Sequence, residues 1–289
     1  MAFHIIGGSA SLPLVRPYDW PRLSPEGSRI AVEVEAQTWV YDVTRDTLTR
    51  LAFEGTQNDA PLWTPDGRRI AVRTNRAESP PSVFWQMADG SGQAERLTTA
   101  VAVGDVPQSF SRDGQFMTFH KQDPKTRRDI YVLSVKDRKA SVFLQTPATE
   151  GAPRFSPDGR WIAYVSDESG SPEIYVQPYP GPGGKWQIST SGGVEPLWNP
   201  NGRELFYRNG NQVMAVPITT APAFTPGKPV VLFEGNYLSS PFPATGVTYD
   251  TVDGQRFLMV KEWEDPTAVT QINVVVNWFE ELRRLVPTR

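Results

Sequence analysis

The sequence predicts an all-β protein made of repeated units, and three observations support this fold class. First, proline (27 residues) and glycine (23 residues) are abundant and 11% of the chain is aromatic, which favours short strands joined by tight turns. Second, one turn motif recurs along the chain, each time before an aromatic or β-branched segment. Third, the copies are spaced at a near-regular interval, which indicates a repeat architecture.

The clearest copy of the motif spans residues 152–164 and reads Ala-Pro-Arg-Phe-Ser-Pro-Asp-Gly-Arg-Trp-Ile-Ala-Tyr. Pro157 presets φ for the first corner of a turn, and Asp158 bonds to nearby backbone N–H groups. Gly159 accepts the left-handed conformation that closes a hairpin. The residues from Trp161 onward have the composition of a buried strand. The motif therefore predicts a strand, a tight turn and a second strand.

Six copies of the motif align on the glycine of the turn, although the third copy is weaker and the sixth is degenerate. Successive glycines are 40, 47, 45, 43 and 52 residues apart, and they are Gly27, Gly67, Gly114, Gly159, Gly202 and Gly254. A period in the forties, with strands throughout, is typical of one four-stranded propeller blade per repeat. We therefore expect a six-bladed β-propeller of four-stranded antiparallel blades.

The whole chain, residues 1–289, is expected to form this single domain. The repeats start near residues 17, 57, 104, 149, 193 and 245, and residues 279–289 form a polar, helix-like tail. The sixth repeat is one strand short, and a circular array of sheets must leave no open edge. We therefore expect a strand from residues 1–16, either residues 3–6 or residues 12–15, to close the ring.

Composition and charge exclude several classes of function. The net charge of −3 and the pI near 5.6 give no phosphate-binding surface, so nucleic acid is not an expected partner. The absence of cysteine excludes disulfides, thiolate catalysis and cysteine-ligated metals. No run approaches the roughly 20 apolar residues that span a bilayer, so this chain is not expected to insert into a membrane. Residues 1–14 lack the basic start and apolar core of a signal peptide.

The sequence carries no recognisable catalytic motif. It lacks a Gly-x-Ser-x-Gly nucleophile elbow, a phosphate-binding loop and a dinucleotide-binding glycine pattern. His4 and His120 are its only histidines, too few for a three-histidine metal site, and neither stands in a pattern typical of a catalytic base. We therefore predict no catalytic residues and no cofactor, and interpret His120 as a polar residue at a strand end.

One set of charged residues stands out, because a carboxylate precedes the first strand of five repeats. These residues are Asp19, Asp59, Asp105, Glu150 and Glu195. The first strand of each blade lines the central channel, so the five side chains are expected to converge at one channel mouth. Converging like charges attract cations, which indicates either a site for Ca²⁺ or a site for a basic partner segment. In the alternative interpretation, each carboxylate bonds to loop N–H groups of its own blade.

These repeats resemble the TolB-like propellers, which carry a Pro-x-(Trp/Phe)-Ser-Pro-Asp-Gly-x-x-Ile-Ala-(Tyr/Phe) signature. Residues 152–164 match it nearly throughout, and residues 61–72 and 196–207 match with Thr64 and Asn199 in place of serine. More narrowly, some segments look like the propeller that follows the transmembrane segment of bacterial eukaryotic-type serine/threonine kinases. These segments are residues 48–53, 181–193, 204–217 and 273–287. This resemblance implies an extracytoplasmic, periplasmic module that is tethered to a kinase in the full-length protein.

The leading prediction for function is a non-enzymatic binding or sensor propeller that uses the loop face around the central channel. Its partner would be a protein, a peptide or a small cell-envelope ligand. The alternative is a lactonase-like propeller hydrolase with a carboxylate-bound Ca²⁺ at the channel mouth, and a third reading is the detached front domain of a prolyl-oligopeptidase-type peptidase. The Ser-Pro-Asp-Gly turns lie at the opposite mouth, where turn geometry explains their repetition, and they are assigned no chemistry.

Overall fold

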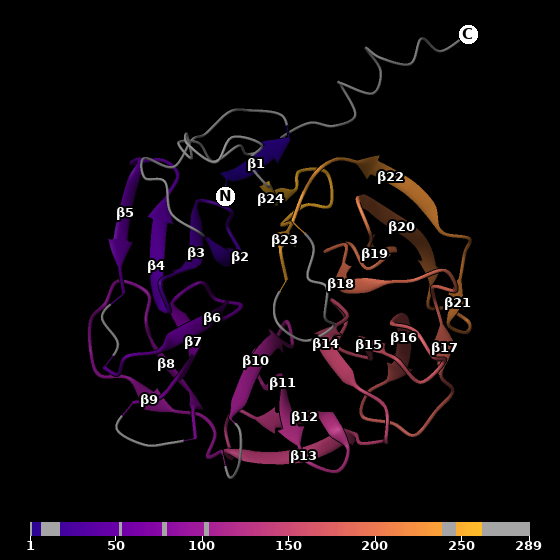
Figure 1. Cartoon of the computed structure of the whole chain (residues 1–289), viewed down its shortest axis with the longest axis horizontal. Helices are drawn as coiled ribbons and strands as arrows, with labels where there is room; N and C mark the ends of the chain where they lie inside the picture. The colour runs from indigo at the N-terminus through magenta and orange to yellow at the C-terminus, as the bar shows by residue number, and fades with distance from the viewer. Residues whose placement is uncertain are drawn as a thin grey trace, which may run out of the picture.

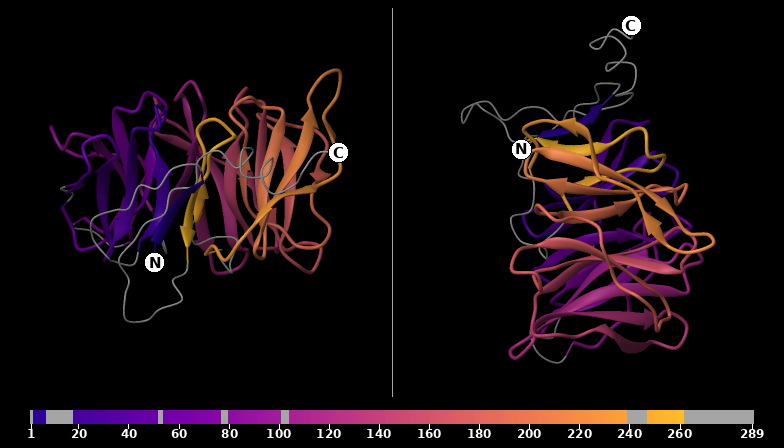
Figure 2. Two further views of the ribbon diagram at one scale, coloured as in Figure 1. Left: turned by 90° about the horizontal axis from the view of Figure 1, so that it is seen from above. Right: turned by 90° about the vertical axis from the view of Figure 1, so that its right-hand side faces the viewer.

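The structure is a computed structural model that describes residues 2–6, 18–51, 54–76, 80–100, 104–238 and 247–261. Its regular structure consists of β-strands, which form antiparallel sheets arranged in a ring (Figure 1). Viewed from the side, the strands of neighbouring sheets run across the thickness of the ring (Figure 2). The described part of the chain contains no helix long and apolar enough to cross a membrane. The all-β propeller prediction is confirmed.

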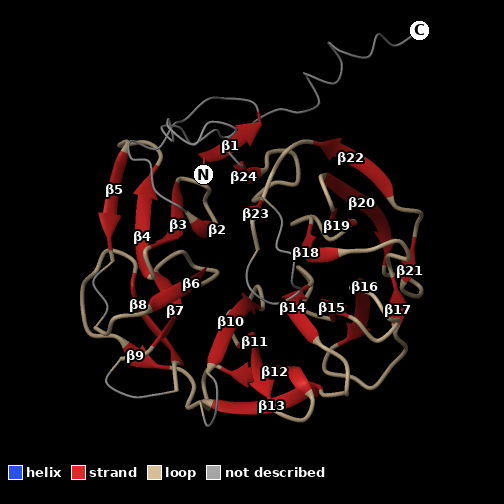
Figure 3. Ribbon diagram, in the orientation of Figure 1, coloured by secondary structure: helices blue, strands red, loops and turns tan. Residues whose placement is uncertain are grey.

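Five sheets are complete blades, in which the strands follow one another from the centre of the ring outward (Figure 3). Blade 1 contains β2 (Asp19–Leu23), β3 (Arg29–Val34), β4 (Gln37–Asp42) and β5 (Thr47–Arg50). Blade 2 contains β6 (Asn58–Trp63), β7 (Arg69–Thr74), β8 (Ser82–Met87) and β9 (Glu95–Arg96). Blade 3 contains β10 (Asp105–Phe110), β11 (Phe116–Asp123), β12 (Arg127–Ser134) and β13 (Lys139–Leu144).

Blades 4 and 5 continue the same meander. Blade 4 contains β14 (Glu150–Phe155), β15 (Trp161–Ser166), β16 (Glu173–Pro178) and β17 (Trp186–Gln187). Blade 5 contains β18 (Val194–Trp198), β19 (Glu204–Asn209), β20 (Gln212–Thr219), β21 (Thr225–Pro226) and β22 (Val230–Glu234). Both β21 and β22 pair with β20, so this blade has a divided outer edge.

The sixth sheet joins the two ends of the described chain and has three strands. It consists of β23 (Tyr249–Asp250), β24 (Leu258–Lys261) and the N-terminal β1 (Ala2–Ile6), in the order β1-β24-β23. The prediction of six complete blades is therefore wrong: the structure has five, because β23 is only two residues long and one strand position is filled from the far end of the chain. β1 includes residues 3–6, the first of the two segments expected to close the ring, and it pairs with β24 at the edge of this sheet; residues 12–15 lie outside the described residues.

The hydrophobic core lies between neighbouring sheets. Ala31 of blade 1 packs with Trp63, Ile70 and Val72 of blade 2, and comparable clusters join each pair of sheets around the ring. The sixth sheet is sealed in the same way on both sides: Leu258 belongs to the cluster with blade 1, and other residues of this sheet belong to the cluster with blade 5. Burial of apolar area at about 25 cal/mol per Å² therefore stabilises the ring at its closure as well as within the repeats.

The repeated turn forms as the sequence predicts. In blade 4 the Ser156 hydroxyl accepts a hydrogen bond from the Trp161 N–H (3.0 Å) and donates one to Asp158 (2.6 Å). The Gly159 N–H donates to the Ser156 carbonyl (2.9 Å), and its φ of +72° lies in the left-handed region. Thr64 makes the equivalent two side-chain bonds in blade 2.

Candidate functional site

The five carboxylates singled out in the sequence lie at the start of the innermost strand of each blade. Asp19, Asp105 and Glu150 are the first residues of their strands, and Asp59 and Glu195 are the second residues of theirs. Asp19 is exposed, whereas the other four are buried. They therefore share the mouth of the ring opposite the Ser-Pro-Asp-Gly turns, and we call it the loop mouth.

Two of these carboxylates form ion pairs with basic side chains of the same blade. Asp59 forms a two-point ion pair with Arg73, with Nε–Oδ1 and Nη2–Oδ2 distances of 2.7 and 2.5 Å. Asp105 lies 3.7 Å from the Lys121 ammonium. Both pairs use the neighbouring strand of the blade, so the negative charge is balanced locally.

Two other carboxylates accept hydrogen bonds from hydroxyl or backbone N–H groups. Glu150 accepts a hydrogen bond from the Thr146 hydroxyl, and burial raises the pKa of Glu150 to about 7. Glu195 accepts two hydrogen bonds of 2.8 Å from Thr248, one from its N–H and one from its hydroxyl. Within the described residues, no three acidic or histidine side chains are arranged to hold a metal ion. The Ca²⁺ site stays a prediction.

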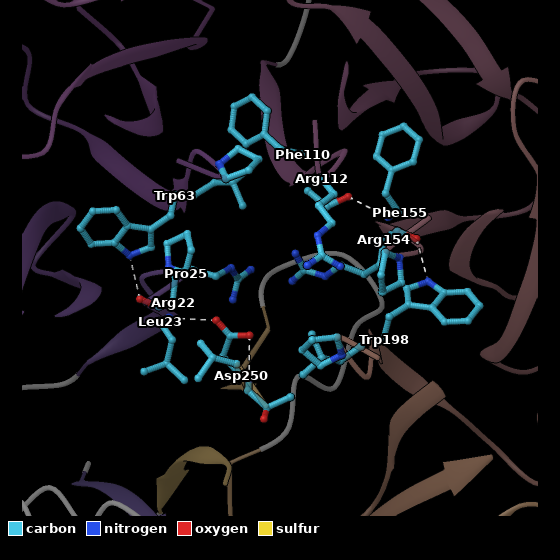
Figure 4. A pocket seen from close by; sticks show the side chains of 18 of the residues that line it. Arg22, Leu23, Pro25, Trp63, Phe110, Arg112, Arg154, Phe155, Trp198 and Asp250 are labelled. Carbon is cyan, nitrogen blue, oxygen red and sulfur yellow. Dashed lines mark hydrogen bonds between the residues drawn. The ribbon is translucent and has the colours of Figure 1, made fainter. Parts of the chain in front are cut away.

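A cavity of about 500 Å³ lies at the opposite mouth, which we call the turn mouth (Figure 4). Residues from all five blades and from the sixth sheet line it. Its rim is formed by the second residue of each repeated turn. These rim residues are Pro25, Pro65, Arg112, Pro157, Pro200 and Val252. The prolines of the turns thus line this cavity in addition to shaping the turns.

The wall of the cavity comes from one repeated position, two residues before the first residue of each turn. In the five blades this position holds Arg22, Leu62, Ser109, Arg154 and Leu197. Asp250 of β23 completes the wall from the sixth sheet. An innermost strand turns this side chain toward the central axis because successive side chains point to opposite faces. The next residue, such as Trp63, packs into the core between blades.

Arg22 and Arg154 dominate the electrostatics of the cavity. Both are buried, with 4% and 7% of their surface exposed, and their guanidinium groups extend toward the middle of the cavity (Figure 4). The Nη1 atom of Arg22 donates to the Pro21 carbonyl (2.9 Å), and the Nη1 atom of Arg154 donates to the Gln108 carbonyl. The Nε atom of each arginine has no hydrogen-bond partner among the described residues.

Burial is the main influence on the charge of these groups. Burial, together with the neighbouring charge of Arg154, lowers the pKa of Arg22 to about 9, although Asp250 and Glu195 act in the opposite direction. A pKa near 9 still leaves the guanidinium group charged at neutral pH. Burial likewise raises the pKa of Asp250, whose oxygens accept hydrogen bonds from the N–H groups of Leu23 (2.8 Å) and Thr251 (2.9 Å).

Tryptophans of adjacent blades fix the backbone of both arginines. The indole N–H of Trp63 donates to the Arg22 carbonyl at 3.0 Å, and that of Trp198 donates to the Arg154 carbonyl at 3.1 Å. Each indole is also buried between blades, as the sequence predicts for this repeated aromatic position. The two arginines are therefore preorganised by packing that involves no ligand.

Sequence reasoning missed this cavity because it followed the carboxylates to the loop mouth. Two signals were present in the motif. The residue directly after the proline that begins the motif is arginine in the first and fourth copies and leucine in the second and fifth. In addition, Arg112 stands where four other copies have proline.

Residues 108–241 match the family described as the TolB beta propeller domain. The Tol-Pal system protein TolB of Hahella chejuensis is 31% identical over 137 residues, which are 44% of this chain and 30% of that protein. The uncharacterized peptidase YuxL of Bacillus subtilis is 29% identical over 119 residues, 39% of this chain and 18% of that protein. The matched parts thus span less than a third of either relative.

A solved structure, putative TolB from Agrobacterium tumefaciens, has a TM-score of 0.65 and 18% sequence identity to this chain. The superposition covers 76% of this chain and 81% of that one. At 18% sequence identity, this similarity shows a shared fold only.

Proposed function

We propose that this chain, in which residues 108–241 match the TolB beta propeller domain, is a non-enzymatic protein-interaction module that works outside the cytoplasm. The partner would insert a short segment into the turn-mouth cavity. One observation carries this proposal: all six sheets contribute to a single cavity on the axis of the ring. The matched relative from Hahella chejuensis is named as part of the Tol-Pal system, which supports a role in association with other proteins. The narrower resemblance to kinase-linked propellers stays a prediction.

The chemistry of the cavity suits binding. Its volume of about 500 Å³ lies within the range of ligand sites, roughly 300–1,000 Å³. The wall combines leucines and prolines with a few fixed polar groups, a pattern typical of recognition sites. The rim prolines and the hydrogen-bonded strands are ordered before a partner arrives, which reduces the entropy lost on association.

Ser109 contributes a hydroxyl group to the wall of the cavity, and this group makes hydrogen bonds within the fold. The Ser109 hydroxyl pairs with Thr118 (2.8 Å) and accepts the N–H of Phe155 (3.0 Å). The first bond lies within blade 3 and the second connects blade 3 to blade 4, and neither links the hydroxyl to a base that could activate it as a nucleophile. The arrangement therefore favours binding over acyl transfer.

The proposal is tested by selecting linear peptides from a random display library on the purified protein. Leu197→Trp fills the cavity from its wall, and Val231→Trp adds the same bulk on the outer strand β22, where Val231 is 49% exposed. We expect the enriched peptides to bind Leu197→Trp at least about tenfold more weakly than the wild type, a loss of roughly 1.4 kcal/mol, and to bind Val231→Trp unchanged. Absence of enriched peptides, or equal binding to both variants, overturns the proposal.

A further inference from the structure

We propose that the turn-mouth cavity recognises a carboxylate on the inserted segment, through the guanidinium groups of Arg22 and Arg154 that line it. This inference rests on the proposed function and specifies the chemistry of the partner. It starts from two side chains more than nine-tenths buried, each with a donor that has no partner among the described residues. Such donors are uncommon in folded proteins, because an unsatisfied buried polar group is costly.

The charges around the cavity support an anionic ligand. The lining contains Arg22, Arg112 and Arg154 but a single carboxylate, Asp250. That carboxylate already accepts two backbone N–H groups. The next buried acid, Glu195, is outside the lining, accepts hydrogen bonds from Thr248 and has the Arg208 guanidinium as a neighbouring countercharge. The cavity thus keeps an excess of positive charge that a ligand carboxylate would balance.

The geometry of the arginines suits a carboxylate in particular. A guanidinium presents several N–H groups in a planar fork that matches the two oxygens of a carboxylate. The Nη1 atom of each arginine donates to a backbone carbonyl, which fixes the plane of the group, and each guanidinium group extends toward the middle of the cavity (Figure 4). Leucine and proline side chains lie beside the arginines in the lining, and a charge-assisted hydrogen bond is stronger in surroundings of low polarity.

A carboxylate can come from an acidic side chain or from the C-terminus of a peptide. Four acetylated tetrapeptides distinguish these sources: Ala-Ala-Ala-Ala as free acid and as amide, and Ala-Ala-Glu-Ala amide with its Ala-Ala-Gln-Ala counterpart. The readout is the NMR signal of the arginine Nε–H groups in the full chain, assigned with Arg22→Lys and Arg154→Lys. The exposed Arg160→Lys, whose partner is Asp158, serves as the matched control.

We expect at least one carboxylate peptide, at about 1 mM, to shift the Nε–H signals of Arg22 and Arg154, whereas its neutral counterpart does not. Each cavity lysine variant should weaken binding at least about tenfold, and Arg160→Lys should not. Unchanged arginine signals, or equal binding of acidic and neutral peptides, overturn the inference. If the display peptides occupy the cavity but tolerate replacement of every carboxylate by an amide, this inference fails while the proposed function stands.

Discussion

Buried charged residues occupy both mouths of the ring, but their surroundings differ. At the turn mouth, Arg22 and Arg154 outnumber Asp250 and retain unpaired donors. At the loop mouth, Arg73 pairs with Asp59, while Glu150 has only a hydroxyl partner and a pKa near 7. Positive charge is therefore kept available at the first mouth, whereas at the second mouth Asp59 is paired and Glu150 is partly protonated near neutral pH.

Glu150 gives a prediction about pH. Burial raises its pKa from 4.5 to about 7, so between these values the folded state binds the proton more tightly than the unfolded chain. The stability that this proton contributes is fully present below pH 4.5 and is lost as the pH rises through about 7. Between roughly pH 5 and pH 8, the free energy of unfolding of the wild type should therefore fall by about 1–2 kcal/mol more than that of Glu150→Gln, whose side chain does not titrate.

Urea unfolding of wild type and Glu150→Gln at these two pH values measures the effect. Glu234→Gln, at an exposed position of the outer strand β22, is the control and should follow the wild type. Equal pH dependence in wild type and Glu150→Gln would contradict the assignment of the shifted proton to this residue.

At the scale of elements, the repeated turn gives a second prediction. Ser156→Ala removes the acceptor of the Trp161 N–H and the donor to Asp158, so it should lower the free energy of unfolding by about 1–2 kcal/mol. Denaturant unfolding checks this value. Ser191→Ala changes an exposed serine of a blade 4 to blade 5 connection and should stay within about 0.5 kcal/mol of wild type. A loss no larger for Ser156 than for Ser191 would contradict the role of the hydroxyl.

Local features explain why the strands and turns could be predicted from the sequence. The turn at Gly159 depends on four adjacent residues, and the strand after it depends on its own composition. The place of β1 beside β24 depends on pairing between residues about 250 positions apart, which no local pattern encodes. The cavity depends on how far Leu62, Leu197 and the arginines reach into the axis, a property of the assembled ring.

At the scale of the whole molecule, β1 is the feature that joins the ends of the ring. Its removal leaves the edge of β24 unpaired and takes one strand from a sheet that has three. Deletion of residues 1–6 should therefore lower the melting temperature by roughly 5–10 °C, corresponding to a few kcal/mol. Deletion of residues 284–289 removes the same length from the predicted tail and serves as the comparison. An unchanged melting temperature after the first deletion would refute closure by β1.

The order of side chains around the turn-mouth cavity bears on how a partner enters it. Arg22 is followed by Leu62 in the next blade, and three blades later Arg154 is followed by Leu197. In a ring of six sheets, a pattern that repeats after three sheets has an approximate twofold axis along the channel. An entering segment thus meets the same arginine–leucine pair on either side. The symmetry is broken where one half presents Ser109 and the other Asp250, so the two ends of an inserted segment would meet different side chains.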